Sequence, residues 1–168
     1  MVQRSGFYTD GTNVIQRVIG IEWDLGFDKT AKRQYIERIK EALPDMLKPM
    51  IDVTSASPNA LHRSLSPIFI EFSGDSLENF IQKNPQVLVP GIIDFLYMKC
   101  LSSSQKQLIR DTNCFIDVFH KPENGRNTQA ACCAYAKLLM LRGKENLLND
   151  IDAFLSWYND VGFYTLGG

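Results

Sequence analysis

The chain has 168 residues, a length that favours one domain and suffices to bury a core without disulfide bonds or metals. Hydrophobic residues make up 45% and charged residues 22%, ordinary values for a globular domain, which argues against disorder of the whole chain. Lys and Arg (18) balance Asp and Glu (19) to a net charge of -1, which excludes binding of duplex nucleic acid by bulk charge alone.

The first half of the chain predicts short strands and helices separated by turns. Residues 1–12 are rich in turn formers, so we expect a loose terminus there. The elements that follow are indicated by β-branched runs, helical spacing of apolar residues and capping residues. They are strand 14–23, helix 31–43 capped by Thr30, strand 51–54, helix 58–64 capped by Ser57, strand 68–72, and a helix from Asp75 or Ser76 to residue 82.

The second half predicts mostly helices. The expected elements are helix 91–101, helix 103–111, a strand or irregular apolar segment at 115–119, helix 128–142, helix 144–158, and a loose tail at 160–168. The helix at 128–142 is apolar almost all round, so it belongs in the middle of the core. The sequence therefore predicts one α+β domain spanning 1–168, mainly helical around a small β-sheet, with this central helix buried.

Nothing in the sequence indicates a membrane-spanning or secreted protein. The most apolar stretch, residues 87–98, is too short and too interrupted to cross a bilayer, and no apolar signal region follows the N-terminus. The cysteines show no C-x-x-C spacing and only two histidines accompany them. We therefore expect reduced core cysteines, no metal site and a cytoplasmic location. The cysteines are Cys100, Cys114, Cys132 and Cys133.

The most informative segment is the polar loop of residues 120–129, which leads into the central helix. The first N–H groups of a helix are unpaired and attract phosphate or carboxylate, and Lys121 and Arg126 add positive charge nearby. Asn127 or Thr128 would lie at the cap and Gln129 in the first turn. The functional interpretation of this loop is a phosphate or diphosphate site. The alternative is a well-capped core helix whose loop is only solvated.

Two further features have both a functional and a structural interpretation. Glu78 lies on a short helix beside aromatic residues, where a raised pKa would suit a general acid or base, but a surface glutamate also complements a helix N-terminus. Trp23 and Trp157 would suit stacking on a base or nicotinamide ring, although tryptophans more often belong to the core. The sequence contains no glycine-rich phosphate loop.

Three collinear stretches together resemble the DarT-associated NADAR antitoxin family. The first is I-E-W-D-L-G-F at 21–27 with the basic helix that follows, and the second runs from I-D-V-T-S-A-S-P at 51–58 to Leu65-Ser66. The third extends from I-D-F-L-Y at 93–97 to residue 155 and includes N-T-Q-A at 127–130. Each piece alone is weak, and the resemblance depends on their common order.

The resemblance implies a NADAR-like α+β fold and removal of ADP-ribose from guanine bases by hydrolysis of an N-glycosidic bond, which reverses a DarT-type toxin. It implies Glu78 as the acid or base and no cofactor. Its ligand would be an ADP-ribosyl nucleotide or ADP-ribosylated nucleic acid. The expected ligand-binding residues are Asn127, Gln129, Lys121, Arg126 and Trp23.

One departure from the family gives a second hypothesis. Family members have tens of residues between the glutamate helix and the next helix, whereas only residues 83–92 separate them here. The missing stretch carries much of the pocket wall, so catalysis could be lost. The alternative function is a non-catalytic NADAR-scaffold protein, of phage or mobile-element type, that binds a toxin or host protein. A monomer and a homodimer both remain open, and no membrane is expected as partner.

Overall fold

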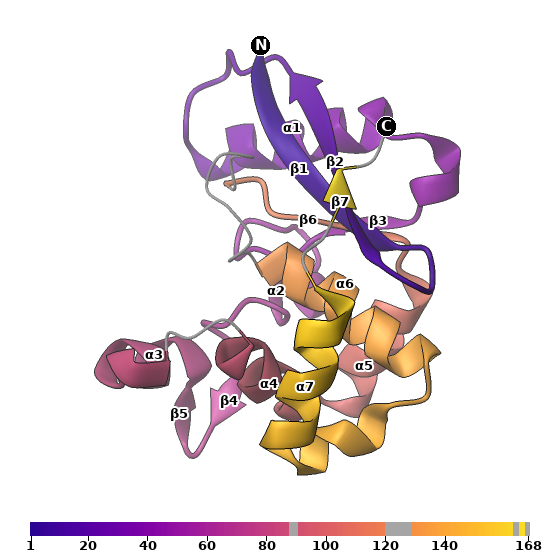
Figure 1. Ribbon diagram of the computed structural model, residues 1–168. Helices are drawn as coiled ribbons and strands as arrows, with labels where there is room; N and C mark the ends of the chain where they lie inside the picture. Colours follow the sequence, from indigo (N-terminus) through magenta and orange to yellow (C-terminus); the bar gives the residue numbers. More distant parts are fainter. Residues whose placement is uncertain (88–90, 120–128, 163–164, 167–168) are drawn as a thin grey trace.

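A five-stranded mixed sheet lies in the upper half of the molecule in the computed structural model (Figure 1), which describes residues 1–87, 91–119, 129–162 and the backbone of 165–166. The strand order is β3-β6-β1-β2-β7. The β1–β2 and β1–β6 pairs are antiparallel, and the β3–β6 and β2–β7 pairs are parallel. The strands are β1 Val2–Thr9, β2 Val14–Ile21, β3 Met50–Asp52, β6 Cys114–Ile116 and β7 Thr165–Leu166. A separate two-stranded hairpin is formed by β4 Glu71–Phe72 and β5 Asp75–Ser76.

The prediction of loose ends is wrong for the N-terminus, because Val2–Thr9 is the middle strand of the sheet. Four consecutive residues of β1, from Arg4 to Phe7, are buried. A strand covered on both faces lacks the alternation of a half-exposed one, so its pattern gave no signal. The tail prediction at 160–168 is also wrong in part, since β7 pairs with β2.

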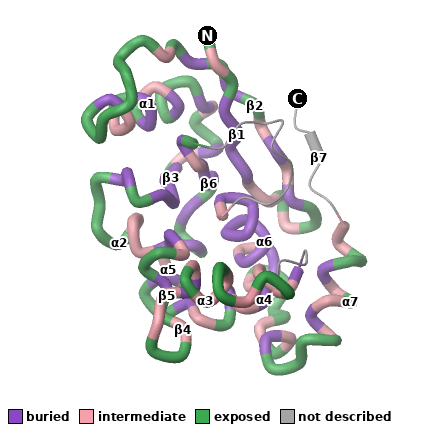
Figure 2. Tube along the Cα trace, turned by 90° about the vertical axis from the view of Figure 1, so that its left-hand side faces the viewer, coloured by how far each residue is buried: buried purple, intermediate pink, exposed green. Residues whose placement is uncertain are grey.

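Two layers of helices cover the sheet. Helix α1 (Lys29–Ala42) packs on one face against Ile19 and Ile21 of β2, and α6 (Gln129–Leu141) packs on the other against Phe7 and Val14. Nine of the thirteen residues of α6 are buried, so the prediction of a central core helix is confirmed (Figure 2). The helices around α6 are α4 Ile92–Lys99, α5 Ser103–Asp111 and α7 Ile151–Val161.

The α+β class is confirmed, with about half of the chain helical rather than most of it. Three predicted helix boundaries are corrected. Asp28, not Thr30, caps α1, and Asn59, not Ser57, caps α2 (Ala60–Arg63). The single helix expected at 144–158 is divided, because the extended backbone of Asp150 (φ -144°) ends a 3-10 helix, η4 Glu145–Asn149, and caps α7. The remaining elements are η1 Asp45–Leu47, η2 Pro85–Val87 and α3 Leu77–Lys83.

Within the described ranges, no helix has both the length and the apolar composition needed to cross a membrane. All four cysteines are free, with Cys100 half-buried and the other three buried.

Candidate functional site

Residues 64–70, which we name the hub segment, connect α2 to β4 and hold three helices together. Three backbone carbonyls of this segment each accept a hydrogen bond from a different helix. The pairs are Gln105 Nε2 of α5 to Ser64 O (3.0 Å), Tyr97 Oη of α4 to Leu65 O (2.7 Å) and the Glu78 N–H of α3 to Pro67 O (3.2 Å). The hub segment therefore fixes the start of α3, with Glu78 in its first turn, against the inner helices α4 and α5.

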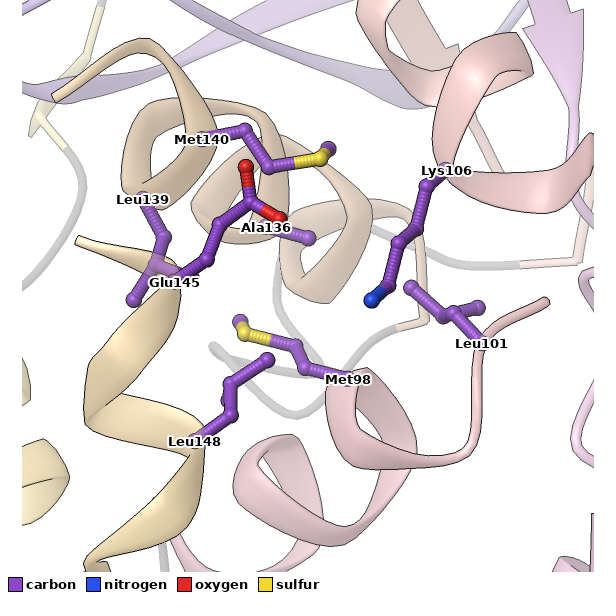
Figure 3. A pocket seen from close by; sticks show the side chains of 8 residues that line it. All are labelled: Met98, Leu101, Lys106, Ala136, Leu139, Met140, Glu145 and Leu148. Atoms are coloured by element: carbon purple, nitrogen blue, oxygen red, sulfur yellow. The ribbon is translucent and has the colours of Figure 1, made fainter. Parts of the chain in front are cut away.

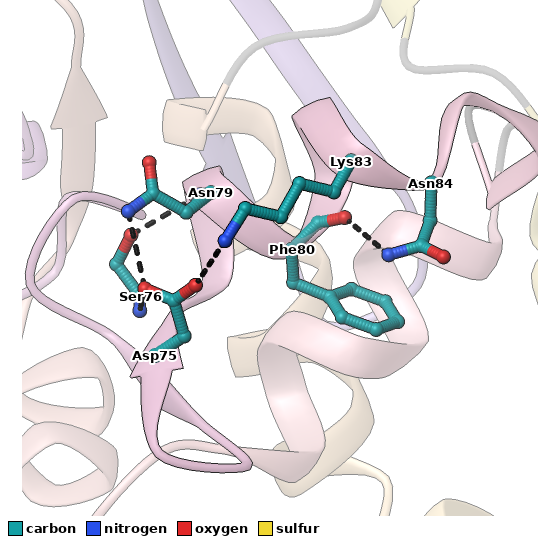
Figure 4. Close-up of polar contacts among 6 residues, drawn as sticks. All are labelled: Asp75, Ser76, Asn79, Phe80, Lys83 and Asn84. Atoms are coloured by element: carbon teal, nitrogen blue, oxygen red, sulfur yellow. Dashed lines mark hydrogen bonds and ion pairs between the residues drawn. The ribbon is translucent and has the colours of Figure 1, made fainter.

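Glu78 is half-buried in the first turn of α3, which Ser76 caps through a hydrogen bond from the Asn79 N–H. The nearest cation on this helix is paired elsewhere, because Lys83 Nζ lies 3.1 Å from the Asp75 carboxylate (Figure 4). Within the described residues, the Glu78 carboxylate makes no hydrogen bond or ion pair.

A polar cluster lies where α6 begins, beneath the hub segment. It consists of side chains from α4 and α6 surrounded by core residues. Tyr97 Oη lies 3.4 Å from Cys133 Sγ, and burial raises the pKa of Tyr97 well above its usual range while the adjacent Gln129 amide opposes this rise. The members of the cluster are Asp94, Tyr97, Gln129, Cys132 and Cys133.

The two thiols of this cluster stay protonated near neutral pH. Burial raises the pKa of Cys132 well above its usual range, and the negative charge of Asp94 raises it further. Burial raises the pKa of Cys133 to about 12. Because the thiolate is the reactive form of cysteine, neither residue is suited to act as a nucleophile.

Gln129 Nε2 is buried and has no hydrogen bond of good geometry within the described ranges, although its amide lies near enough to Tyr97 and Cys132 to oppose the rise in the pKa of both. A buried donor without an acceptor costs about 1–3 kcal/mol, so an oxygen atom that approaches the start of α6 would remove this penalty. Gln129 lies beside Tyr97, which binds the hub segment directly. The hub segment thus bonds to the Glu78 backbone directly, whereas Gln129 lies only beside Tyr97, the residue that bonds to Leu65.

A groove of about 240 Å³ adjoins the hub segment. Its walls include Phe69, whose side chain is 54% exposed, and Arg63. Hydrogen bonds of 2.9 Å from the Arg63 guanidinium to the Ser57 and Pro58 carbonyls hold this side chain in place. An exposed ring beside a fixed cation is suited to contact with a base and a phosphate.

The structure does not bring every predicted site residue to this region. Trp23 packs on the α1 side of the sheet, where it stacks on Tyr35 (centroids 3.7 Å apart) under the Arg4 guanidinium (4.4 Å). Its ring therefore already has partners, on the opposite side of the sheet from α6. The predicted residues Lys121, Arg126 and Asn127 lie outside the described residues, so the shared hollow between residue 78 and the start of α6 stays a prediction.

Sequence reasoning missed the buried carboxyl of Asp52, at the end of β3. Its Oδ1 accepts a hydrogen bond from the Val118 N–H (3.0 Å), and its Oδ2 accepts from the N–H and hydroxyl of Thr54. Burial raises the pKa of Asp52 to about 7. The group ties the end of β3 to Val118, two residues after the end of β6.

A small cavity between α4, α5, α6 and η4 is not a substrate site (Figure 3). Its volume is about 10 Å³, which is at the lower limit for one water molecule. Apolar side chains such as Met98, Leu101 and Leu139 form most of its wall. The cavity is a packing defect of the core.

A scan of the chain against protein-family models finds no match, and a search of curated proteins finds no similar sequence.

Proposed function

We propose that this protein recognises an ADP-ribosyl group attached to a guanine base. It hydrolyses the N-glycosidic bond that joins the ADP-ribose to the guanine. The observation that supports this proposal is that Glu78, whose carboxylate makes no hydrogen bond or ion pair within the described residues, lies in the first turn of a helix bonded to Pro67, while the buried Gln129 amide lies beside Tyr97, which bonds to Leu65. The collinear resemblance to NADAR antitoxins supplies the identity of the ligand.

In this reaction the bond between C1 of the ribose and the nitrogen of guanine breaks, and water adds to C1. Glu78 removes a proton from the attacking water or delivers one to the leaving base, and its charge stabilises the oxocarbenium-like transition state. The products are free ADP-ribose and unmodified guanine. Gln129 Nε2 donates a hydrogen bond to an oxygen of the ligand, which the buried amide otherwise lacks. The proposal assigns the phosphates to Lys121 or Arg126, and the orientation of the ligand to Asn127 together with Gln129.

The test is release of ADP-ribose from ADP-ribosylated guanosine, followed by chromatography. We expect turnover by the natural protein and a loss of about 100-fold or more in Glu78→Gln, since acid–base groups contribute about 10²–10⁴-fold. Glu71→Gln is the matched control, because Glu71 is an exposed carboxylate on the neighbouring hairpin, and it should retain full activity. Equal rates for Glu78→Gln and the natural protein would remove Glu78 from the mechanism.

A second function, that of a non-catalytic interaction protein, is favoured by the short connection between α3 and α4. Only Asn84 to Gly91 separates these helices, so the enlarged pocket wall of the family has no counterpart in this connection. Phe27 and Met46, each 77% exposed, provide apolar surface for a toxin, a host protein or a second copy. A chain that neither releases nor binds ADP-ribose would favour this function over hydrolysis.

A further inference from the structure

A second groove lies at the opposite end of α6 from Gln129. It has a volume of about 270 Å³ and is bordered by the turn of the β1–β2 hairpin, the C-terminal end of α6 and the last turns of α7. Helix α6 has thirteen residues, which places this groove about 20 Å from the first turn of the helix. The groove is therefore distinct from the site proposed above.

Two cations line this groove and have no partner among the described residues. Arg142 and Lys144 are exposed and make no ion pair or side-chain hydrogen bond there. These side chains are not required as partners for the last carbonyls of α6. The carbonyls of Leu138, Met140 and Leu139 already accept hydrogen bonds from the backbone N–H groups of residues 142–144. Both side chains are thus available to an anion.

An aromatic wall lies in the same groove. Trp157 is half-buried, and its inner part packs on the core, with its ring 5.8 Å from that of Phe154 at 48°. Within the described residues its indole N–H makes no hydrogen bond. A ring fixed on one side and open to a groove on the other is suited to stacking against a planar ligand.

The groove also contains one carboxylate, Asp160, near the end of α7. This carboxylate would repel a simple anion. A ligand that combines an anionic group with N–H donors would instead pair with the two cations and donate hydrogen bonds to Asp160. Guanine presents two adjacent N–H donors on its pairing edge, and a carboxylate can accept both, whereas adenine offers only its amino group there.

We propose that this groove binds a guanine nucleotide. The base stacks on Trp157 and donates to Asp160, and the phosphate lies between Arg142 and Lys144. Because this site is separate from Glu78, its occupancy does not depend on the hydrolytic activity proposed above.

The experiment is equilibrium binding of 5'-GMP to the full chain, measured by dialysis and by tryptophan fluorescence. In Trp23→Phe, Trp157 is the remaining tryptophan, so its quenching reports on this groove. We expect saturable quenching with a Kd of about 1 mM or below, and binding at least about tenfold weaker for guanosine, inorganic phosphate and 5'-AMP. Dialysis of the natural protein gives the same Kd should Trp23→Phe fold poorly.

Substitutions of cations supply the controls. The double variant Arg142→Ala/Lys144→Ala should weaken GMP binding at least about tenfold. The double variant Lys29→Ala/Lys40→Ala removes the same charge from exposed positions on α1 and should leave it unchanged. Equal affinity for GMP and phosphate, absence of saturable binding, or an unchanged Kd in the Arg142/Lys144 variant would each overturn the proposal.

Discussion

Replacing Tyr97 with alanine is expected to lower the free energy of unfolding by at least about 3–5 kcal/mol, the cost of deleting a buried aromatic side chain. Tyr97 is 0% exposed and is among the largest fully buried side chains of the core. The substitution also removes the hydroxyl that donates to Leu65 O, so α4 loses its bond to the hub segment. Because a domain of this size has only about 5–15 kcal/mol of stability, most of it would be lost.

Urea unfolding followed by circular dichroism measures this effect. Tyr97→Phe isolates the hydroxyl and should cost about 1–3 kcal/mol, because the Leu65 carbonyl is left without its partner. Tyr8→Phe, on the half-exposed part of β1, is the matched control and should change stability by less than about 0.5 kcal/mol. A Tyr97→Phe variant as stable as the natural protein would show that this hydrogen bond does not hold the hub segment.

The second large effect is a dependence of stability on pH that originates from Asp52. Burial raises the pKa of this carboxyl from 3.8 in the unfolded chain to about 7 in the folded protein, and the nearby charge of Asp117 adds to the rise. Between these two values the folded state holds a proton that the unfolded state has released. The free energy of unfolding therefore falls as the pH rises from about 4 to about 7, by a few kcal/mol from this group alone.

Asp52→Asn tests this dependence, since asparagine keeps an acceptor for the Val118 N–H and does not titrate. The quantity to measure is the free energy of unfolding of the natural protein minus that of the variant, at several pH values. We expect this difference to fall steadily between about pH 4 and pH 7 and then to level off. Asp45→Asn, at an exposed carboxylate that pairs with Lys48, is the matched control. If the difference for Asp52→Asn did not change with pH, the raised pKa of Asp52 would be contradicted.

Much of the helical part of the fold could be predicted from local signals. The start of α5 follows from Ser102 and Gln105, which form a capping box, and Gly143 ends α6 as expected. Strand β1 could not be predicted, because its burial on both faces depends on helices that are distant in the sequence. The break at Asp150 was missed because apolar residues at helical spacing continue on both sides of it.

The candidate site was predictable only in its individual residues. Glu78 was found through the resemblance, and Gln129 through its place at the start of an apolar helix. The hub segment, which bonds to the Glu78 backbone and to Tyr97, was missed because its role depends on backbone carbonyls that carry no sequence signal. Asp94 and Tyr97, three residues apart on α4, were overlooked since a lone pair at this spacing is equally typical of a core helix.

The central claim is that Glu78 and Gln129 contact one ligand, and a double-mutant cycle on the Kd of ADP-ribose tests it most directly. Calorimetric titrations of the natural protein, Glu78→Gln, Gln129→Leu and the double variant give the four values. We predict that each single substitution weakens binding about tenfold. The change in binding free energy of the double variant should differ from the sum of the two single changes by at least about 0.5 kcal/mol. Absence of ADP-ribose binding, or binding that neither substitution alters, would contradict the claim.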